Sequence, residues 1–335
     1  MITLNYSNKP KLANEIALYK HEWNSVRTSA CDMWAEIDSY IHATDTSMLE
    51  GGEFFDHKTF IPVISEIHED LISIIYSTVF PHEDWLGWKG FDVKAIAETK
   101  RKKLLSFIKQ VHSLNGFSAT FRKVIDDLVR YGNCFVDVGF TNETQTEDDE
   151  SVSGFIGPKP IRISPYDIVF NPSASDFGKT PKIITSLIST GEFKEFIDGL
   201  GADSEISEEV LKQLLSRRAG GGTDNSDVYK ENQYIAAGFG SIKEYYTSGM
   251  IELLWFYGDI FDEETQDIHK GRCVVVVDGN TVVYDKYQPK SKIFKGSWKP
   301  RPDNLWSQGP LDNLVGINYM INHRENSKND SIDKF

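Results

Sequence analysis

Apolar side chains recur every three or four residues through most of the first 130 residues. This spacing places them on one face of an α-helix. The apolar stripes predict helices over residues 16–40, 64–75, 93–111 and 117–131. Pro81 is expected to stop the second helix, and Gly116 with Ser118 predicts a break and a cap before the fourth. The N-terminal third is therefore predicted to be helical.

After Gly132 the apolar period changes to two, which is the alternation of a β-strand. The patterns predict strands at 135–140 and 161–163, a short third element at 166–170 and helices within 191–216. The acidic stretch 143–150 is expected to be a solvated hairpin tip or a flexible loop. Three consecutive glycines, Gly220, Gly221 and Gly222, predict a mobile loop over 217–227.

The last third again has strand patterns. They predict a buried strand at 251–257, an acidic turn at 262–265 and a hairpin over 274–283 around Asp278-Gly279-Asn280. Residues 286–308 contain three prolines and are predicted to be irregular. A last helix is predicted to open at Pro310, a favourable position in a first turn. The fold class predicted is α+β: a helical N-terminal third, a β-rich part with inserted helices, and a final helix.

Composition narrows the class of protein. The 335 residues carry 36 Lys+Arg against 50 Asp+Glu, a net charge of -14, and 40% are hydrophobic. The chain can bury a core, and its length suggests roughly two domains or one elaborated domain. Its 3 Cys form no close pair, which disfavours a disulfide scaffold. The sequence shows no signal peptide and no apolar run long enough for a bilayer, so we expect a soluble protein made in the cytoplasm. Because its net charge is negative, we do not expect it to bind duplex DNA over a broad face.

Candidate catalytic and metal sites each have a simpler interpretation. Gly178-Lys179-Thr180 matches the end of a phosphate-binding loop, but Ser173 replaces the first glycine and Pro181 disfavours the helix that should follow, so a turn is expected. The triplets 68–70 and 82–84 both read His-Glu-Asp, yet they lack the second His of a zinc helix, and we expect them to be solvated helix ends.

Acidic residues offer the only other candidate chemistry. Asp137 in a strand and Asp262, Glu263 and Glu264 in a turn are ligands or acid–base groups in principle, although such acids usually face solvent. No Ser/His/Asp or Cys/His arrangement appears as a local motif. We therefore predict no enzyme, no catalytic residue, no cofactor and no metal.

Two basic segments are candidate nucleic-acid contacts. The run 100–103 lies on a predicted helix and is expected to be a solvated face. Residues 286–301 interleave Lys290, Lys292, Lys295 and Lys299 with the aromatic residues Tyr287, Phe294 and Trp298. That pattern suits single-stranded nucleic acid, but a packed loop or a subunit contact is the favoured interpretation.

Four stretches in order resemble the portal proteins of tailed double-stranded DNA bacteriophages. The stretches are 125–136, which contains Tyr131-Gly132-Asn133; 163–174, with a Pro-Tyr-Asp turn; 251–283, with a strand, an acidic turn and a hairpin; and 306–318, with Trp306-Ser307-Gln308-Gly309-Pro310-Leu311. The resemblance covers about residues 115–335 and rests on their order and spacing.

The resemblance implies a ring of about twelve copies at one capsid vertex, through which DNA is packaged and ejected. It implies a helical wing region at 1–130, an α/β wing core at 131–305 and the start of a stem helix at 306–335, inside which the chain ends. The stem or subunit-interface residues expected are Trp306, Gly309, Pro310, Leu311, Leu314, Asn318 and Asn322.

The same resemblance implies partners and a location. The expected partners are further copies of the chain, the major capsid protein, the terminase motor, head-tail adaptor proteins and double-stranded DNA as passing cargo, with no membrane. The protein would be assembled in the host cytoplasm and reside in the virion. Two alternatives stay open: an acidic metal-dependent hydrolase or nuclease, and another phage head-tail connector component.

Overall fold

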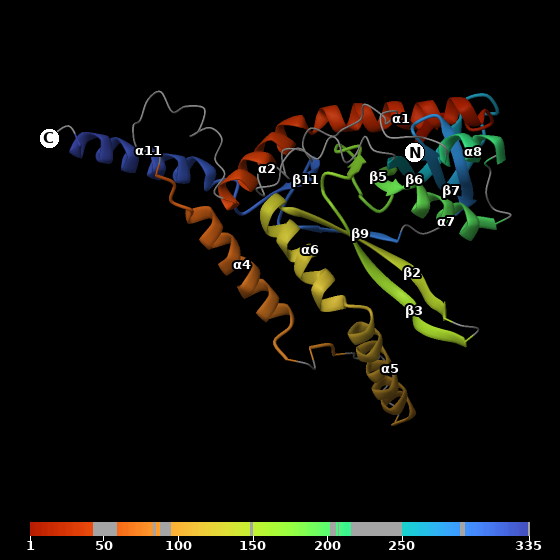
Figure 1. Ribbon diagram of the computed structural model, residues 1–335, viewed down its shortest axis with the longest axis horizontal. Helices are drawn as coiled ribbons and strands as arrows, with labels where there is room; N and C mark the ends of the chain where they lie inside the picture. The colour runs from red at the N-terminus through yellow and green to blue at the C-terminus, as the bar shows by residue number, and fades with distance from the viewer. Residues whose placement is uncertain are drawn as a thin grey trace.

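The computed structural model describes residues 1–42, 59–82, 85–87, 95–147, 150–201, 206, 208–215, 250–288 and 292–333. Within these ranges the fold is mixed α+β, as the sequence predicts, with eight helices and eleven strands. A body of two main sheets carries three projections: the helix α11, the helix α5 and the hairpin of β2 and β3 (Figure 1).

The larger sheet has the strand order β4-β5-β6-β7-β8, with β1 added in parallel beside β6. Its strands are β1 (Ile2–Leu4), β4 (Ile168–Phe170), β5 (Lys182–Ser189), β6 (Met250–Asp262), β7 (Ile268–Val277) and β8 (Thr281–Tyr287). All other neighbours pair antiparallel. The predicted strand at 251–257 and the hairpin over 274–283 are confirmed, with Gly279 at φ +71° in its turn.

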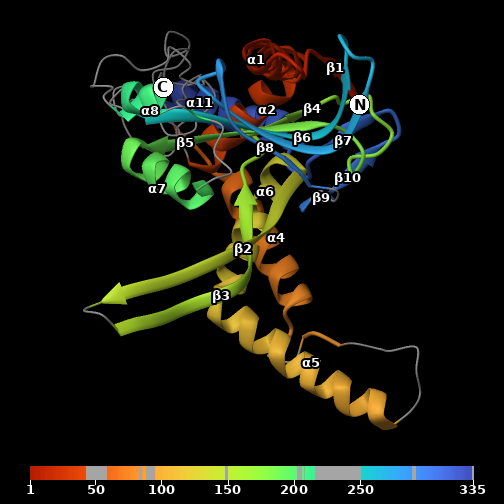
Figure 2. The same cartoon turned by 90° about the vertical axis from the view of Figure 1, so that its right-hand side faces the viewer.

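Helices cover both faces of this sheet (Figure 2). In β7, Val274 and Val276 pack with α1 (Lys9–Val26), whereas Val275 and Val277 pack with α7 (Thr190–Leu200) and α8 (Glu208–Leu215). Successive strand residues point to opposite faces, so an uninterrupted run of valines fits a strand buried on both sides.

The second sheet joins the remaining long strands in the order β3-β2-β9. Its members are β2 (Asn133–Glu147), β3 (Glu150–Ile163) and β9 (Ile293–Ser297), and a small pair consists of β10 (Lys299–Arg301) and β11 (Asn304–Gln308). Residues 286–308 were predicted to be irregular, which is wrong: three strands lie there. Pro300 lies in the three-residue strand β10, where a missing N–H is tolerated, and Pro302 lies in the turn that follows it.

A helical layer packs beside the second sheet. It contains α2 (Thr28–Ile41), α4 (Val63–Val79), α5 (Ala95–Leu114), α6 (Phe117–Tyr131) and α11 (Val315–Ile332). The predicted single helix at 16–40 is in fact two helices. Arg27 separates them, and its buried guanidinium donates hydrogen bonds to the carbonyls of Pro165, Tyr166 and Ile168. Hydrogen bonds between residues so far apart in the sequence cannot be predicted from the spacing of apolar residues.

Other predicted features have mixed outcomes. Gly178-Lys179-Thr180 lies in a turn, as expected. The acidic stretch 143–150 is the end of a long hairpin, because β2 and β3 continue to Glu147 and Glu150. The strand β5 was missed. The glycine-rich segment 217–227 and residues 83–84 lie outside the described residues.

Candidate subunit interface

Trp306 is buried in an aromatic cluster between the second sheet and α2. Its ring stacks on Phe170 at 4.5 Å between centroids and meets Trp34 and Phe135 edge-on at 5.4 and 5.7 Å. Aromatic pairs at these distances favour offset or edge-to-face arrangements. Only 6% of Trp306 is exposed, so it anchors the segment that leads to α11 and is already covered by its own chain.

Tyr131-Gly132-Asn133 and the segment around Gly309 bind each other directly. Gly132 ends α6 in the left-handed conformation (φ +67°), and its N–H donates to the Leu128 carbonyl. The Asn133 side chain donates to the carbonyl of Ser307 at 3.0 Å and accepts from the Ser307 N–H at 2.9 Å. A side chain at Gly132 would meet the backbone of Gln308 and Gly309. Two stretches that carry the family resemblance are thus one structural unit.

The last helix begins at Val315, not at Pro310 as predicted. The Gly309 N–H donates to Asp312 and the Leu314 N–H donates to the Leu311 carbonyl, so residues 309–314 form turns before the helix. Leu311 is fully buried and Leu314 is partly buried among the helices α2, α4 and α6. These two predicted site residues therefore fix the start of α11 to the body.

Three asparagines on α11 hold it against residues 59–64, the segment that leads into the first turn of α4. The Oδ1 atoms of Asn318, Asn322 and Asn326 accept hydrogen bonds from the backbone N–H groups of Ile64, Ile61 and Thr59, at 3.3, 3.0 and 2.7 Å. All three side chains are at most 1% exposed.

The asparagine spacing matches the geometry of the two segments. Four helical residues rise about 6 Å and two extended residues span about 6.6 Å, so Asn326 and Asn322 meet the N–H groups of Thr59 and Ile61. Asn318 meets the N–H of Ile64, which lies in the first turn of α4, where an N–H has no partner within its own helix. Asn318 and Asn322 were predicted as interface or stem residues. Asn326 was missed, although its position four residues after Asn322 was the available signal.

The opposite side of α11 is exposed in the part of the chain that the structure describes. Ile317 is 52% exposed and Met320 is 51% exposed. At about 100° per residue, both lie on the side of the helix away from the three asparagines. The helix projects from the body, as Figure 1 shows. The surface that a neighbouring subunit could contact is thus formed by these residues, whereas the predicted Trp306, Leu311, Asn318 and Asn322 are internal.

A buried ionic network lies at the base of α4 and α6. Asp127 accepts two hydrogen bonds from the Arg162 guanidinium, at 2.6 and 2.5 Å. Asp38 accepts bonds from the Tyr131 hydroxyl at 3.0 Å and from Arg130 at 3.2 Å. Burial raises the pKa of Asp127 to about 7 and that of Asp38 to about 6, with the neighbouring arginines opposing the shift.

His68 belongs to the same network, and the expectation of a solvated helix end is wrong for it. Its side chain is buried, and its Nε2 lies 2.7 Å from Asp126 Oδ1. Although burial opposes the shift, His68 and Arg130 lower the pKa of Asp126. Glu69, the next residue, is exposed. The network ties α2, α4, α6 and β3 together, and each carboxylate is already bonded to side chains of the chain itself.

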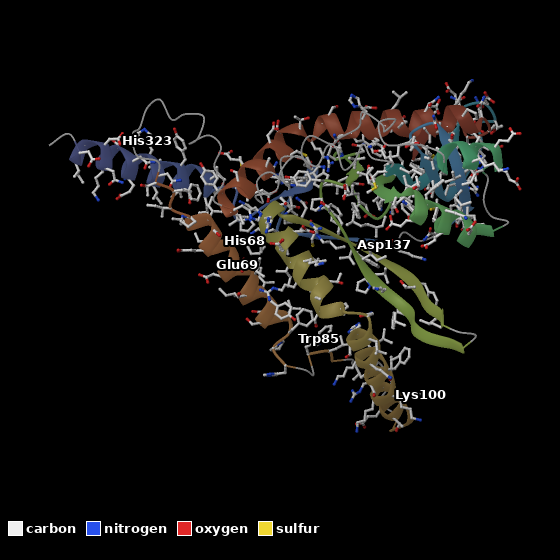
Figure 3. All side chains as sticks on the ribbon, in the orientation of Figure 1. His68, Glu69, Trp85, Lys100, Asp137 and His323 are labelled. Atoms are coloured by element: carbon white, nitrogen blue, oxygen red, sulfur yellow. The ribbon has the colours of Figure 1, made fainter. Side chains whose placement is uncertain are left out.

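The other candidate acidic residues, Asp137 and Asp262, lie in separate parts of the structure. Asp262 is buried and accepts hydrogen bonds from the N–H groups of Ser7 and Glu264 at 3.2 and 3.0 Å, so it closes a turn. Asp137 lies on β2, far from His68 (Figure 3). In the described part of the chain, no group of three or more His, Cys, Asp or Glu side chains is placed to hold a metal ion.

Asp137 lines a cavity of about 630 Å³ beside both sheets, together with Arg162, Asp167, Trp255 and Tyr257. Burial raises the pKa of Asp137. The Trp255 indole N–H donates to Ser186, and Arg162 is bound to Asp127. The cavity therefore offers two half-buried carboxylates, Asp137 and Asp167, and none of its described lining residues is a His, Cys or Lys.

No protein-family model matches the chain, and no curated protein matches its sequence. Among the described residues, no helix is both long enough and apolar enough to cross a membrane.

Proposed function

We propose that this protein is a structural subunit of a portal ring, which occupies one capsid vertex of a tailed bacteriophage and gives passage to double-stranded DNA. The observation that carries the proposal is α11. Its inner face is fixed to the body by Asn318, Asn322 and Asn326, while its outer face presents Ile317 and Met320 to solvent. A helix that is held rigidly and left apolar on its free side suits contact with another copy.

The ordered contact between residues 131–133 and 306–309 supports the same proposal. These segments come from two stretches that resemble portal proteins, and they form the joint from which α11 leaves the body. The net charge of -14 suits a conduit as well, because a surface on which acids outnumber cations repels phosphates and does not hold DNA by counterion release. The proposed partners are the major capsid protein, the terminase motor and head-tail adaptors, with the ring located in the virion.

The experiment is the native mass of the protein, expressed at the full length that its own genome encodes, with electron-microscope images of the same sample. A closed ring of about twelve copies with a central hole is the expected result. A monodisperse monomer that cleaves DNA with Mg²⁺ would overturn the proposal. The nuclease alternative predicts that such cleavage is lost in Asp137→Asn or Asp262→Asn.

A further inference from the structure

The cavity beside Asp137 runs along the edges of two strands. It is lined by residues 161–164, where β3 ends, and by residues 184–187 of β5. Successive residues of a strand point to opposite faces of its sheet, so a cavity that touches four in a row touches the edge of the strand. β3 is the outer strand of the second sheet, in the order β3-β2-β9. The cavity therefore gives access to strand backbone as well as to side chains.

The second half of β5 has an open edge. β4 pairs only with residues 182–184 of β5, and the Thr185 N–H donates to the Asp167 carbonyl at 2.8 Å. Backbone groups of alternate residues point to the same side of a strand, so those of Leu187 point the same way as those of Thr185. In the part of the chain that the structure describes, no strand pairs with Leu187 on that side, whereas β6 pairs with the whole of β5 on the other. Such an edge is a template for an added strand.

The cavity beside this edge is acidic and apolar. Its acids are Asp137 and Asp167, and its apolar and aromatic residues are Ile161, Ile163, Ile184, Leu187, Met250, Trp255 and Tyr257. Among the described lining residues Arg162 is the one cation, and its guanidinium binds Asp127 at 2.6 and 2.5 Å. Lys292, whose charge opposes the rise that burial causes in the pKa of Asp137, is exposed and lies outside the lining.

This lining suits a lysine or arginine side chain. Carboxylates accept charge-assisted hydrogen bonds from an ammonium or a guanidinium, while aromatic and apolar walls cover the stem of the side chain. Two carboxylates repel phosphates, so the cavity disfavours nucleic acid. Its volume of about 630 Å³ lies in the range of clefts that enclose a ligand.

We infer that an extended segment of a partner protein adds as a strand to the edge of β5 at residues 185–187 and places a lysine or arginine side chain in the cavity. The open edge supplies backbone hydrogen bonds, which give affinity, and the carboxylates of Asp137 and Asp167 select a basic residue. Apolar residues at alternate positions of the segment cover Ile161, which is 48% exposed, and Leu187. The inference goes beyond the proposed ring and does not depend on it, because the edge and the cavity belong to a single copy of the chain.

Peptide selection on the full-length protein supplies the probe. A display library of random nine-residue peptides is selected, and the most enriched peptide is synthesised with blocked ends and titrated by calorimetry. We expect one Lys or Arg among alternating Val, Ile or Thr residues. Replacing that basic residue by Glu, or methylating alternate backbone nitrogens, should each weaken binding at least about tenfold, because the first removes the charge pair and the second removes the strand hydrogen bonds.

Variants of the protein locate the contact. Asp137→Asn should weaken binding of the selected peptide about tenfold. Leu187→Pro removes the N–H that the added strand would bind, and an edge position tolerates proline, so it should weaken binding by at least as much while the protein stays folded. If this variant does not fold, the methylated peptide tests the same hydrogen bonds from the partner's side. Asp198→Asn, on the exposed face of α7, is the matched control and should bind as the original protein does.

Two kinds of result would overturn the inference. Strand addition is refuted if no peptide is enriched, or if the selected peptide binds Asp137→Asn and Leu187→Pro as tightly as the original protein. It is also refuted if butylamine displaces the peptide and backbone methylation has no effect, since the cavity is then a site for a small organic cation. Native mass of the same protein measures ring formation separately, so failure of this inference and failure of the proposed function are distinguished.

Discussion

Substituting Gly132 by alanine should break the joint from which α11 leaves the body. The added Cβ would lie 2.5 Å from the Gln308 carbonyl carbon and 2.7 Å from its oxygen, against backbone that cannot rotate away. The φ of +67° adds strain for any residue with a side chain. The left-handed conformation costs about 1 kcal/mol and the forced displacement about 2–3 kcal/mol more. The expected loss of stability is therefore about 3–4 kcal/mol.

Gly116→Ala is the matched control for Gly132→Ala. Gly116 has the same φ of +67°, but no atom lies within 4 Å of the position that its Cβ would occupy. It should lose only the conformational contribution of about 1 kcal/mol. The difference between the two variants isolates the close approach of the two backbones.

The assay is urea denaturation followed by tryptophan fluorescence. Trp306 and Trp34 lie in the aromatic cluster next to the joint, so their emission should shift to the red in Gly132→Ala before global unfolding. If the free energy of unfolding of Gly132→Ala matches that of Gly116→Ala within about 0.5 kcal/mol, the contact between residues 132 and 308–309 does not hold the structure together.

Three further changes test other parts of the molecule. Asn322→Ala removes the acceptor of the Ile61 N–H, which should cost about 2 kcal/mol. Hydrogen exchange of the Ile61 amide, measured by mass spectrometry, should therefore accelerate about 30-fold. Asn329→Ala, on the same helix, is the control, and an equal acceleration in that variant would contradict the role of Asn322. The pKa of Asp127 is about 7 in the folded protein and about 4 in the unfolded chain. Between these pH values the folded state binds a proton that the unfolded state does not, so the contribution of Asp127 to stability falls as the pH rises. Melting temperatures from pH 5 to 8 should therefore fall less steeply in Asp127→Asn, and an unchanged slope would contradict the raised pKa. Met320→Asp should weaken assembly measured by native mass without lowering the melting temperature, and undiminished assembly would show that the outer face of α11 is not an interface.

Local periodicity predicted most helices and the strands β4, β6, β7 and β8 of the larger sheet, because the spacing of apolar residues depends on whether an element buries one face or two. It missed β5, which begins at a buried lysine: Lys182 donates to the Phe177 carbonyl and lies over the Phe177 ring at 4.2 Å. It also missed β9, whose Phe294 is exposed. Short strands with charged or exposed residues are stabilised by their neighbours, which a single window of sequence does not contain.

The candidate site was predicted in part for the same reason. The stretch around Trp306 and Gly309 was singled out, but its packing against residues 131–133 depends on a separation of more than 170 residues along the chain. His68 was misassigned because its partner Asp126 lies 58 residues away. The three asparagines of α11, by contrast, can be recognised in the sequence by their spacing of four residues once Asn326 is included with Asn318 and Asn322.

The parallel pairing of β1 with β6 has a consequence during synthesis. Ile2 lies opposite Ile260, and α1 packs on residues as late as Val282, so the first helix cannot complete its packing until the ribosome has passed residue 282. At about 5–20 residues per second, the apolar side of α1 stays without its sheet for roughly 13–50 seconds. The N-terminus of each nascent chain is therefore the last part of this sheet to be enclosed, and the first surface that a chaperone meets.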